Sequence, residues 1–417
     1  MAPTIKQHVL IIGFVWPEPS SSAAGKRMVQ LIELFQAQGW QVTFASSAAK
    51  TEHMVNLESL GVNTRSIEIN SSTFDTFVAD LRPSIVLFDR FVVEEQFGWR
   101  VAEQCPNAVR VLDTEDLHFL RRARKKAVNE SRSCTEADLR SSKDAKREIA
   151  SIYRSDLSLI ISDTEQDLLE NTFGVQSDLL QYLPFVLEAI TPSTASNWRD
   201  YGQRKDFMTI GNFRHAPNMD AVRYLKKQMW PLIRKQLPDA QLHIYGAYVS
   251  QEAEQMHDPD SGFIIEGRAP NAADVISEAK VMLAPLRFGA GLKGKLIEAM
   301  QCGTPSITTT IGAEGIQGNL SWGGVIADEP EKFADAAVRL YNDEEVWKAS
   351  QEQGALIINK RFAQVDFKRA LIDQITHIQR NLDQHRRQNF TGQMLMHHTA
   401  ASSKYMGRWI EAKNRNR

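Results

Sequence analysis

The 417-residue sequence predicts an α/β protein made of two doubly wound halves. Short runs of Val, Ile and Leu recur along the chain, and stretches with helical spacing separate them, as in parallel sheets whose strands are joined by helices. This alternation stops once, over residues 187–206, and then resumes. We therefore predict two domains that face each other across a cleft at the carboxyl ends of their sheets, where such folds bind ligands.

The predicted N-terminal domain covers residues 1–186. Its strands are short and apolar, which indicates burial on both faces of a sheet, and its helices carry apolar residues at intervals of three and four. The predicted strands are 9–12, 41–45, 84–88, 109–112 and 157–161, and the predicted helices are 28–38, 93–103 and 164–171, with a basic helical region at 121–154.

Residues 187–206 form the predicted linker, because they lack periodicity and contain the turn-forming run TPSTASN at 191–197. The same alternation follows over residues 207–363, the predicted C-terminal domain. Its predicted strands are 207–210, 241–245, 262–265, 281–284 and 306–309, and its predicted helices are 217–236, 270–279, 291–301, 330–342 and 344–358.

Composition excludes several classes of protein. Lys and Arg total 49 against 51 for Asp and Glu, so no basic field indicates nucleic acid as a partner. Three widely spaced cysteines give neither a disulfide framework nor a metal motif, which favours a reducing compartment. The apolar run at 9–16 imitates a signal peptide, but Pro17-Glu18-Pro19 interrupts it. We expect a cytoplasmic protein, at most peripheral to the inner face of a membrane.

The C-terminal tail differs in composition from the rest of the chain. Residues 380–417 contain eight Lys or Arg and two acids, and they lack a sustained apolar face. We interpret residues 386–417 as a solvated, partly ordered basic tail, with a weak contact to a membrane surface or another polyanion as the alternative.

A glycine-containing loop in the second half has the chemistry of an anion site. It follows the strand that ends near Pro285 and runs into a helix, so unpaired N–H groups and the positive end of a helix dipole converge there. A lysine could add full charge, and an acid one turn later could bind a ribose diol. A close-packed turn with a surface Lys–Glu pair is the alternative explanation. The candidate residues are Gly289, Ala290, Gly291, Lys293, Lys295 and Glu298.

The motifs around this loop carry a resemblance to a known family. They are IGNF at 210–213, PNMDA at 217–221, WP at 230–231, PDAQL at 238–242, PLRFGAG at 285–291, EAM at 298–300, GTP at 303–305 and GAEG at 312–315. In order and spacing, the stretch from Thr209 to Ile316 resembles the donor-binding domain of the GT-B glycosyltransferases of the group 1 superfamily. The first half resembles the family more loosely.

The resemblance implies a fold, a reaction and a set of ligands. The fold would be GT-B, with two Rossmann-like domains and a C-terminal helix, here 364–385, that packs back towards the N-terminal domain. The reaction would move a sugar from a nucleotide-sugar donor to a saccharide, a lipid-linked saccharide or another small acceptor. The resemblance implies retention of the anomeric configuration, no metal, and no cofactor, since the nucleotide-sugar is a substrate.

The sequence departs from the family pattern at two places. Many group 1 enzymes carry a glutamate eight positions before the one that matches Glu298, and this chain has Ala290 there. Sugar choice and retention versus inversion therefore stay open. Many members also place an Arg-x-x-x-x-Lys phosphate pair after the first strand of this domain, where the candidates here are Arg214 and, less strongly, His215.

In the first half, polar residues cluster after the predicted strand at 109–112. His118 is similar in placement to a histidine with which many superfamily members face the donor sugar, and we predict catalytic roles for His118, Asp113 and Arg121. The alternatives are a helix-cap or core role for His118 and an N-cap role for Asp113 or Asp116. Metal-binding carboxylates are disfavoured, since the paired α/β halves do not suit that architecture.

The loop at 19–25 leads into a helix that we expect to begin near Ala24, so that its first turn carries Lys26 and Arg27. Cations at a helix N-terminus are unfavourable to the dipole unless an anion lies there, so we predict a donor phosphate or an acidic acceptor near Gly25. A tolerated exposed pair is the alternative. Arg268 and Arg287 are secondary candidates.

We therefore predict a nucleotide-sugar-dependent glycosyltransferase. Two alternatives stay open: a nucleotide-sugar isomerase of the same fold, and a catalytically silent nucleotide-sugar-binding partner in a larger assembly.

Overall fold

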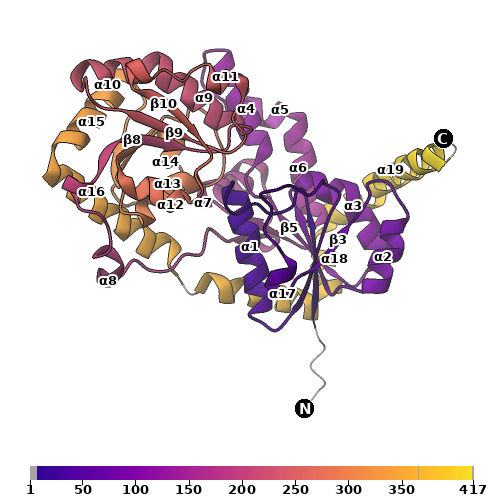
Figure 1. Ribbon diagram of the computed structural model, residues 1–417. Coiled ribbons are helices and arrows are strands. Elements are labelled where there is room, and N and C mark those ends of the chain that lie inside the picture. Colours follow the sequence, from indigo (N-terminus) through magenta and orange to yellow (C-terminus); the bar gives the residue numbers. More distant parts are fainter. Residues whose placement is uncertain (1–6, 365, 416–417) are drawn as a thin grey trace.

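The computed structural model describes residues 7–364 and 366–415. The chain forms two α/β domains that lie side by side, and after the second domain it returns to the first, so that the described C-terminal helices lie against the N-terminal domain (Figure 1). Each domain contains one parallel sheet with helices on both faces, which confirms the predicted fold class.

The first sheet has seven parallel strands in the order β3-β2-β1-β4-β5-β6-β7. The central strands are apolar, as predicted, whereas the edge strand β3 reads Asn-Thr-Arg-Ser and gives no apolar signal. Its strands are β1 (His8–Gly13), β2 (Gln41–Ser46), β3 (Asn63–Ser66), β4 (Ile85–Asp89), β5 (Val109–Asp113), β6 (Leu157–Ile160) and β7 (Leu180–Tyr182).

Strand alternation divides the first core into two layers. Val9 and Ile11 point to one face of the sheet, and Leu10 and Ile12 point to the other, because successive side chains of a strand alternate. The helices that follow these strands are α1 (Ala23–Gln36), α2 (Thr73–Leu81), α3 (Phe91–Gln104), α4 (His118–Asn129), α5 (Glu136–Ser141), α6 (Lys143–Arg154) and α7 (Asp163–Asp167).

The second sheet has six parallel strands in the order β10-β9-β8-β11-β12-β13. Its strands are β8 (Lys205–Ile210), β9 (Leu242–Tyr245), β10 (Phe263–Gly267), β11 (Ala279–Ala284), β12 (Ser306–Thr308) and β13 (Gly324–Ile326). Its helices are α9 (Ala216–Tyr224), α10 (Trp230–Gln236), α11 (Gln251–Glu254), α12 (Ala272–Glu278), α13 (Gly294–Gln301), α14 (Thr310–Ala313), α15 (Pro330–Asn342) and α16 (Glu344–Ile357), and α8 (Pro192–Ala195) lies in the segment between the domains.

Short segments complete the chain between these elements. The 3₁₀ turns are η1 (Glu58–Leu60), η3 (Ser177–Leu179), η4 (Tyr201–Gln203) and η6 (Pro259–Ser261), and the π turns are η2 (Leu168–Thr172), η5 (Leu225–Met229) and η7 (Ile358–Phe362). The π turn η5 joins α9 to α10, where the sequence predicts one helix over 217–236.

Three helices follow the second domain: α17 (Asp366–Arg380), α18 (Leu382–Gln388) and α19 (Phe390–Arg415). Helix α17 places Leu371, Ile375 and Ile378 in the core of the first sheet, beside residues of α1. The tail, for which the sequence predicts an extension without a sustained apolar face, forms the 26-residue helix α19. The sequence shows no apolar helical pattern here because two of the buried positions of α19 are glycines, Gly392 and Gly407.

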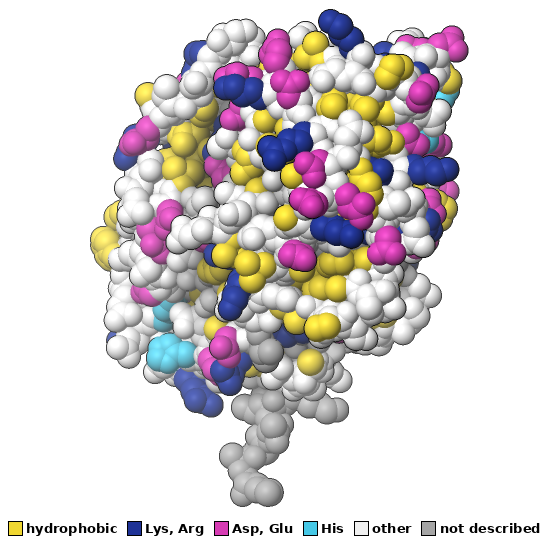
Figure 2. Space-filling model, turned by 90° about the vertical axis from the view of Figure 1, so that its left-hand side faces the viewer, with side chains coloured by type: hydrophobic (Ala, Val, Ile, Leu, Met, Phe, Trp, Pro, Cys, Tyr) yellow, Lys and Arg dark blue, Asp and Glu magenta, His cyan; other side chains and the backbone are white. Residues whose placement is uncertain are grey.

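Basic and acidic side chains are interspersed on the outer face of the second domain (Figure 2), in keeping with the net charge of −2. None of the helices in the described part of the chain combines the length and the apolar character that crossing a bilayer requires.

Candidate functional site

The glycine loop between β11 and α13 meets the first domain directly. Gly291 has a left-handed backbone with φ of 59°, and a Cβ atom there would lie 2.8 Å from Cβ of Asp116. Both the conformation and the close approach therefore require glycine at this position. The lack of a side chain on Gly291 lets the loop pack directly against Asp116 of the first domain.

Two side chains of the first domain hold this loop. The buried carboxylate of Glu165, on α7, accepts hydrogen bonds from the N–H groups of Gly291 (2.7 Å) and Leu117 (3.1 Å). Arg124, on α4, donates to the carbonyl of Gly289 (2.9 Å) and forms a bidentate pair with Glu314, with both N–O distances 2.7 Å. Glu165 and Arg124 thus hold the glycine loop of the second domain against the first domain.

The two loop lysines point in different directions. Lys295 Nζ donates to Asn218 Oδ1 (2.9 Å) beside the turn that follows β8. Lys293 is buried, and its Nζ donates to the carbonyl of Gly291 (2.9 Å) and lies 3.8 Å from Oε2 of Glu314. Burial lowers the pKa of both lysines to about 8. Lys293 therefore supports the loop from within, whereas Lys295 reaches Asn218 at the start of α9.

Glu298 forms an ion pair with Lys26 across the domain boundary. The first turns of α1 and α13 face each other there, since a Cβ atom on Gly294 would lie 2.6 Å from Cβ of Ala23. Both side chains keep solvent access, with 44% of Lys26 and 22% of Glu298 exposed. A ligand that takes the Glu298 carboxylate must therefore displace Lys26.

The second cation of that turn is fully engaged. Arg27 is buried and binds both carboxylate oxygens of Asp113, with Nε–O distances of 3.1 and 3.2 Å, and donates to the carbonyl of Leu183 at 2.7 Å. The two cations of the turn thus meet carboxylates, which accounts for their place at a helix N-terminus. Asp113 lies at the predicted strand end, but its carboxylate holds Arg27. Gly25 packs against the backbone of Glu18, since a Cβ atom on Gly25 would lie 2.5 Å from the carbonyl oxygen of Glu18.

His118 is the first residue of α4 and lies at the cleft side of β5. Its backbone N–H donates to the buried Glu148 (3.1 Å), which caps the helix, and its ring contacts Phe91 edge-on with centroids 5.5 Å apart. Burial, then Arg90, lowers the pKa of His118 to about 3. The imidazole is therefore neutral at pH 7 and can donate or accept a hydrogen bond but carries no charge.

The side chains of both domains converge around His215, which precedes α9. The residue keeps solvent access, and its pKa is lowered by the atoms packed around its ring and then by the charges of Arg121, Lys295 and Arg90 and the neighbouring His118. Arg121 itself pairs with Asp116, and burial lowers its pKa to about 10. The structure thus brings predicted residues of the two domains close together.

The remaining predicted arginines lie at the edges of this region. Arg214 stacks on Tyr248, 3.8 Å from the ring centroid, and the Tyr248 hydroxyl donates to Glu18 of the first domain (2.8 and 3.0 Å). Arg287 is paired with Asp220. Arg268 donates to Ser20 Oγ at 3.0 Å, which adds another contact between the domains.

Arg90 and Glu115, which lie beside this region, were not among the predicted site residues, although Glu115 stands in the polar cluster noted after the strand at 109–112. Both are non-glycine residues with positive φ, 74° and 62°, a strained state that clusters at functional sites. Burial, followed by the charge of Asp113, raises the pKa of Glu115 to about 8. The sequence marks them only by position, because each follows the carboxyl end of a buried strand. Among the described residues, no three His, Cys, Asp or Glu side chains group as metal ligands.

The second domain matches a known protein family. The family model described as glycosyl transferases group 1 matches residues 204–343, which include β8 to α15 and the glycine loop. The predicted resemblance is confirmed. No curated protein sequence matches this chain.

Solved structures cover nearly the whole chain. Sucrose-phosphate synthase from Thermosynechococcus elongatus is 16% identical, with a TM-score of 0.64, over 89% of this chain and 99% of that protein. HepE from Anabaena, solved with UDP and glucose, is 12% identical, with a TM-score of 0.64, over 88% and 99%. TarM is 9% identical, with a TM-score of 0.68, over 90% and 100%. At these identities the likeness concerns the fold alone, which is the two-domain GT-B fold.

Proposed function

We propose that this chain is a nucleotide-sugar-dependent glycosyltransferase whose donor binds the second domain and whose acceptor binds the first. The observation that carries the proposal is the glycine loop before α13, where Gly291 approaches Asp116 of the first domain and Lys295 lies beside Asn218 of the second. A lysine beside a glycine loop and a helix N-terminus suits a diphosphate. HepE, which shares the fold, was solved with UDP and glucose.

The donor diphosphate would lie at the N-terminus of α13. The N–H of Gly291 is already bound to Glu165, so the amides of Gly289 and Ala290, the helix dipole and Lys295 are left for the phosphates. As the sugar departs, negative charge grows on the nucleoside diphosphate. Lys295 would stabilise that charge more in the transition state than in the ground state, which is the condition for catalysis.

The acceptor side would be formed by the loops after β1, β4 and β5. Phe14 and Val15 follow β1 and are exposed, and Arg90 stacks over the Phe14 ring with its guanidinium 5.1 Å from the centroid. Apolar surface beside His118, Arg90 and Glu115 suits a saccharide, whose rings present both C–H faces and hydroxyls, or a lipid-linked saccharide. We propose transfer without a metal and with retention of configuration, as the family resemblance implies.

A panel of nucleotide-sugars tests the proposal. The matching donor should raise the melting temperature, because a ligand at 100 times its dissociation constant adds about 2.7 kcal/mol of stability. With an acceptor present, the nucleoside diphosphate should be released in step with a glycosylated product. Release of an epimerised free nucleotide-sugar would indicate an isomerase instead, and stabilisation without any turnover would indicate a silent binding partner.

Replacing Glu298 with Gln should weaken nucleotide binding by about 1.5 to 3 kcal/mol, because the ribose loses a charge-assisted hydrogen bond. Calorimetric titration with the nucleoside diphosphate measures the change. The matched control is Lys26→Met, which breaks the ion pair but keeps the carboxylate free for ribose. Equal losses in the two variants would mean that Glu298 acts only through Lys26, and unchanged affinity in Glu298→Gln would remove Glu298 from the site.

Activity should survive treatment with EDTA, since Lys295 and the helix N-terminus are expected to supply the positive charge that a metal provides in other transferases. Initial rates before and after chelation, with manganese or magnesium added back, measure this. A reversible loss of activity that either metal restores would contradict metal-independent transfer.

A further inference from the structure

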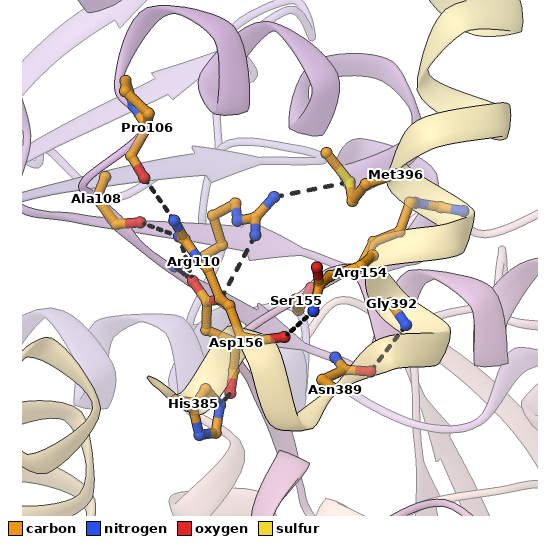
Figure 3. Close-up of polar contacts among 12 residues, drawn as sticks. Pro106, Ala108, Arg110, Arg154, Ser155, Asp156, His385, Asn389, Gly392 and Met396 are labelled. Atoms are coloured by element: carbon orange, nitrogen blue, oxygen red, sulfur yellow. Dashed lines mark hydrogen bonds and ion pairs between the residues drawn. The ribbon is translucent and has the colours of Figure 1, made fainter. Parts of the chain in front are cut away.

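Helix α18 and Asn389, which precede α19, are bonded to the first domain. The buried Asp156 binds Arg386 through both carboxylate oxygens (both distances 2.8 Å), and its backbone carbonyl accepts from His385 (2.7 Å) (Figure 3). Asn389 donates to the carbonyl of Tyr153 (2.7 Å) and caps the helix through Gly392 N–H (2.8 Å). The helix therefore starts from a fixed point.

One face of α19 packs on the N-terminal domain along its length. Gly392 lies against the carbonyl of Tyr153, where a Cβ atom would come within 2.1 Å, and Met396 accepts from Arg110 (3.6 Å). Near the other end, Gly407 is buried, and Glu411 accepts from the N–H of Ser72 (3.0 Å). Helix α19 is thus held at both ends by its inward face.

The opposite face carries large apolar side chains in solvent. Met394, Tyr405 and Trp409 are separated by eleven residues and then four, so they line up along the helix, and Trp409 lies about 200° around the axis from Gly407. Their exposed fractions are 47%, 67% and 59%, and the flanking Met406 is 58% exposed. Within residues 7–364 and 366–415, these side chains therefore stay open to solvent. Helix α19 lies on the side of the first domain away from the second (Figure 1).

The charges beside this face are positive. Arg408 and Lys413 are exposed on its two sides, and Lys413 lies over the Trp409 ring, 5.2 Å from the centroid. Glu411, the acidic residue of α19, is turned inward to Ser72 and pairs with Arg415. The uncovered face is therefore aromatic and apolar with a cationic border.

We propose that the face of α19 formed by Met394, Tyr405, Met406 and Trp409 docks on an anionic lipid surface. Trp and Tyr settle at the level of lipid headgroups, and flanking Lys and Arg attract anionic phosphates. A second copy of the chain fits less well, because a two-fold contact centred on Tyr405 and Trp409 would bring Arg408 and Lys413 of both copies together. The inference is independent of the proposed catalytic activity.

Sedimentation of the full chain with lipid vesicles tests the inference. The protein should bind vesicles of phosphatidylcholine that contain about one-third phosphatidylglycerol at least about tenfold more tightly than vesicles of phosphatidylcholine alone, and high salt should weaken the binding. Trp409→Ser with Tyr405→Ser should reduce binding about tenfold or more, and Arg408→Gln with Lys413→Gln should abolish the preference for the anionic lipid.

Leu356→Ser, an exposed leucine on α16 of the other domain, is the matched control and should bind like the wild type. The melting temperatures of all variants establish that they fold. Equal binding to both vesicle types, no binding, or an unchanged affinity in the folded aromatic variant would overturn the inference. A dimer in light scattering that Trp409→Ser dissolves would also overturn it, since a second copy would then be the occupant.

Discussion

Replacing Lys295 with Met should lower kcat/KM for glycosyl transfer by about 10²- to 10³-fold, the range for removing one preorganised group from a site where charge develops. Lys295 is the loop lysine whose Nζ faces the turn after β8, and its charge is part of the field at His215. Because the charge on the leaving diphosphate grows in the transition state, kcat should fall more than nucleotide affinity. Steady-state kinetics and calorimetry on the same preparation measure both.

Two variants sharpen this experiment. Lys235→Met removes an exposed lysine of α10 in the same domain and should leave kinetics unchanged. Lys293→Met should lower the melting temperature, since Lys293 is buried and supports the loop through Gly291 and Glu314. A stable Lys295→Met protein with near-normal kcat/KM would contradict the proposal that the leaving diphosphate binds at the N-terminus of α13.

His118→Ala should lower turnover by about 10²-fold or more, the range for a positioned acid–base or polar contact. The neutral imidazole at the start of α4 lies beside Arg90 of its own domain and near His215 of the other, where we propose that it contacts the donor sugar or the acceptor during transfer. Nucleotide affinity should hardly change, because the diphosphate and the base are proposed to bind the other domain. Turnover and calorimetric titration of the variant separate the two effects.

The melting temperature decides how that result is interpreted. The side chain of His118 packs on Phe91, so a destabilised variant would indicate a structural role. His377→Ala, at an exposed position on α17, is the control for the loss of an imidazole and should keep full activity. Near-normal turnover in a stable His118→Ala protein would contradict the assignment and leave Arg121 and Arg90 as the first-domain candidates.

The fold could be predicted because buried parallel strands appear in the sequence as short, uninterrupted apolar runs. Each central strand of both sheets lies at or within one or two residues of a predicted run. The edge strands β3, β7 and β13 were missed, because they are three or four residues long and a strand bonded on one side needs little apolar surface. Helix α19 was missed since glycines on its buried face hide the helical period.

The position of a candidate residue could be predicted where one segment carries several features together. Lys295 and Glu298 both lie on α13, directly after the glycine loop, and their roles stay predictions. The orientation of Lys293 could not be predicted. Its side chain is buried beside Glu314, which is held by Arg124 of the other domain. Arg90, Glu115 and Glu165 act through contacts between segments far apart in the chain, and no local pattern records such contacts.

Mass spectrometry of the products formed from a nucleotide-sugar and a saccharide acceptor tests the central proposal most directly. The wild-type chain should release one nucleoside diphosphate for each acceptor that gains the mass of one sugar, and Lys295→Met should slow both products by the same factor. Donor consumed without a glycosylated acceptor, across a panel of donors that stabilise the protein, would contradict glycosyl transfer as the function of this cleft.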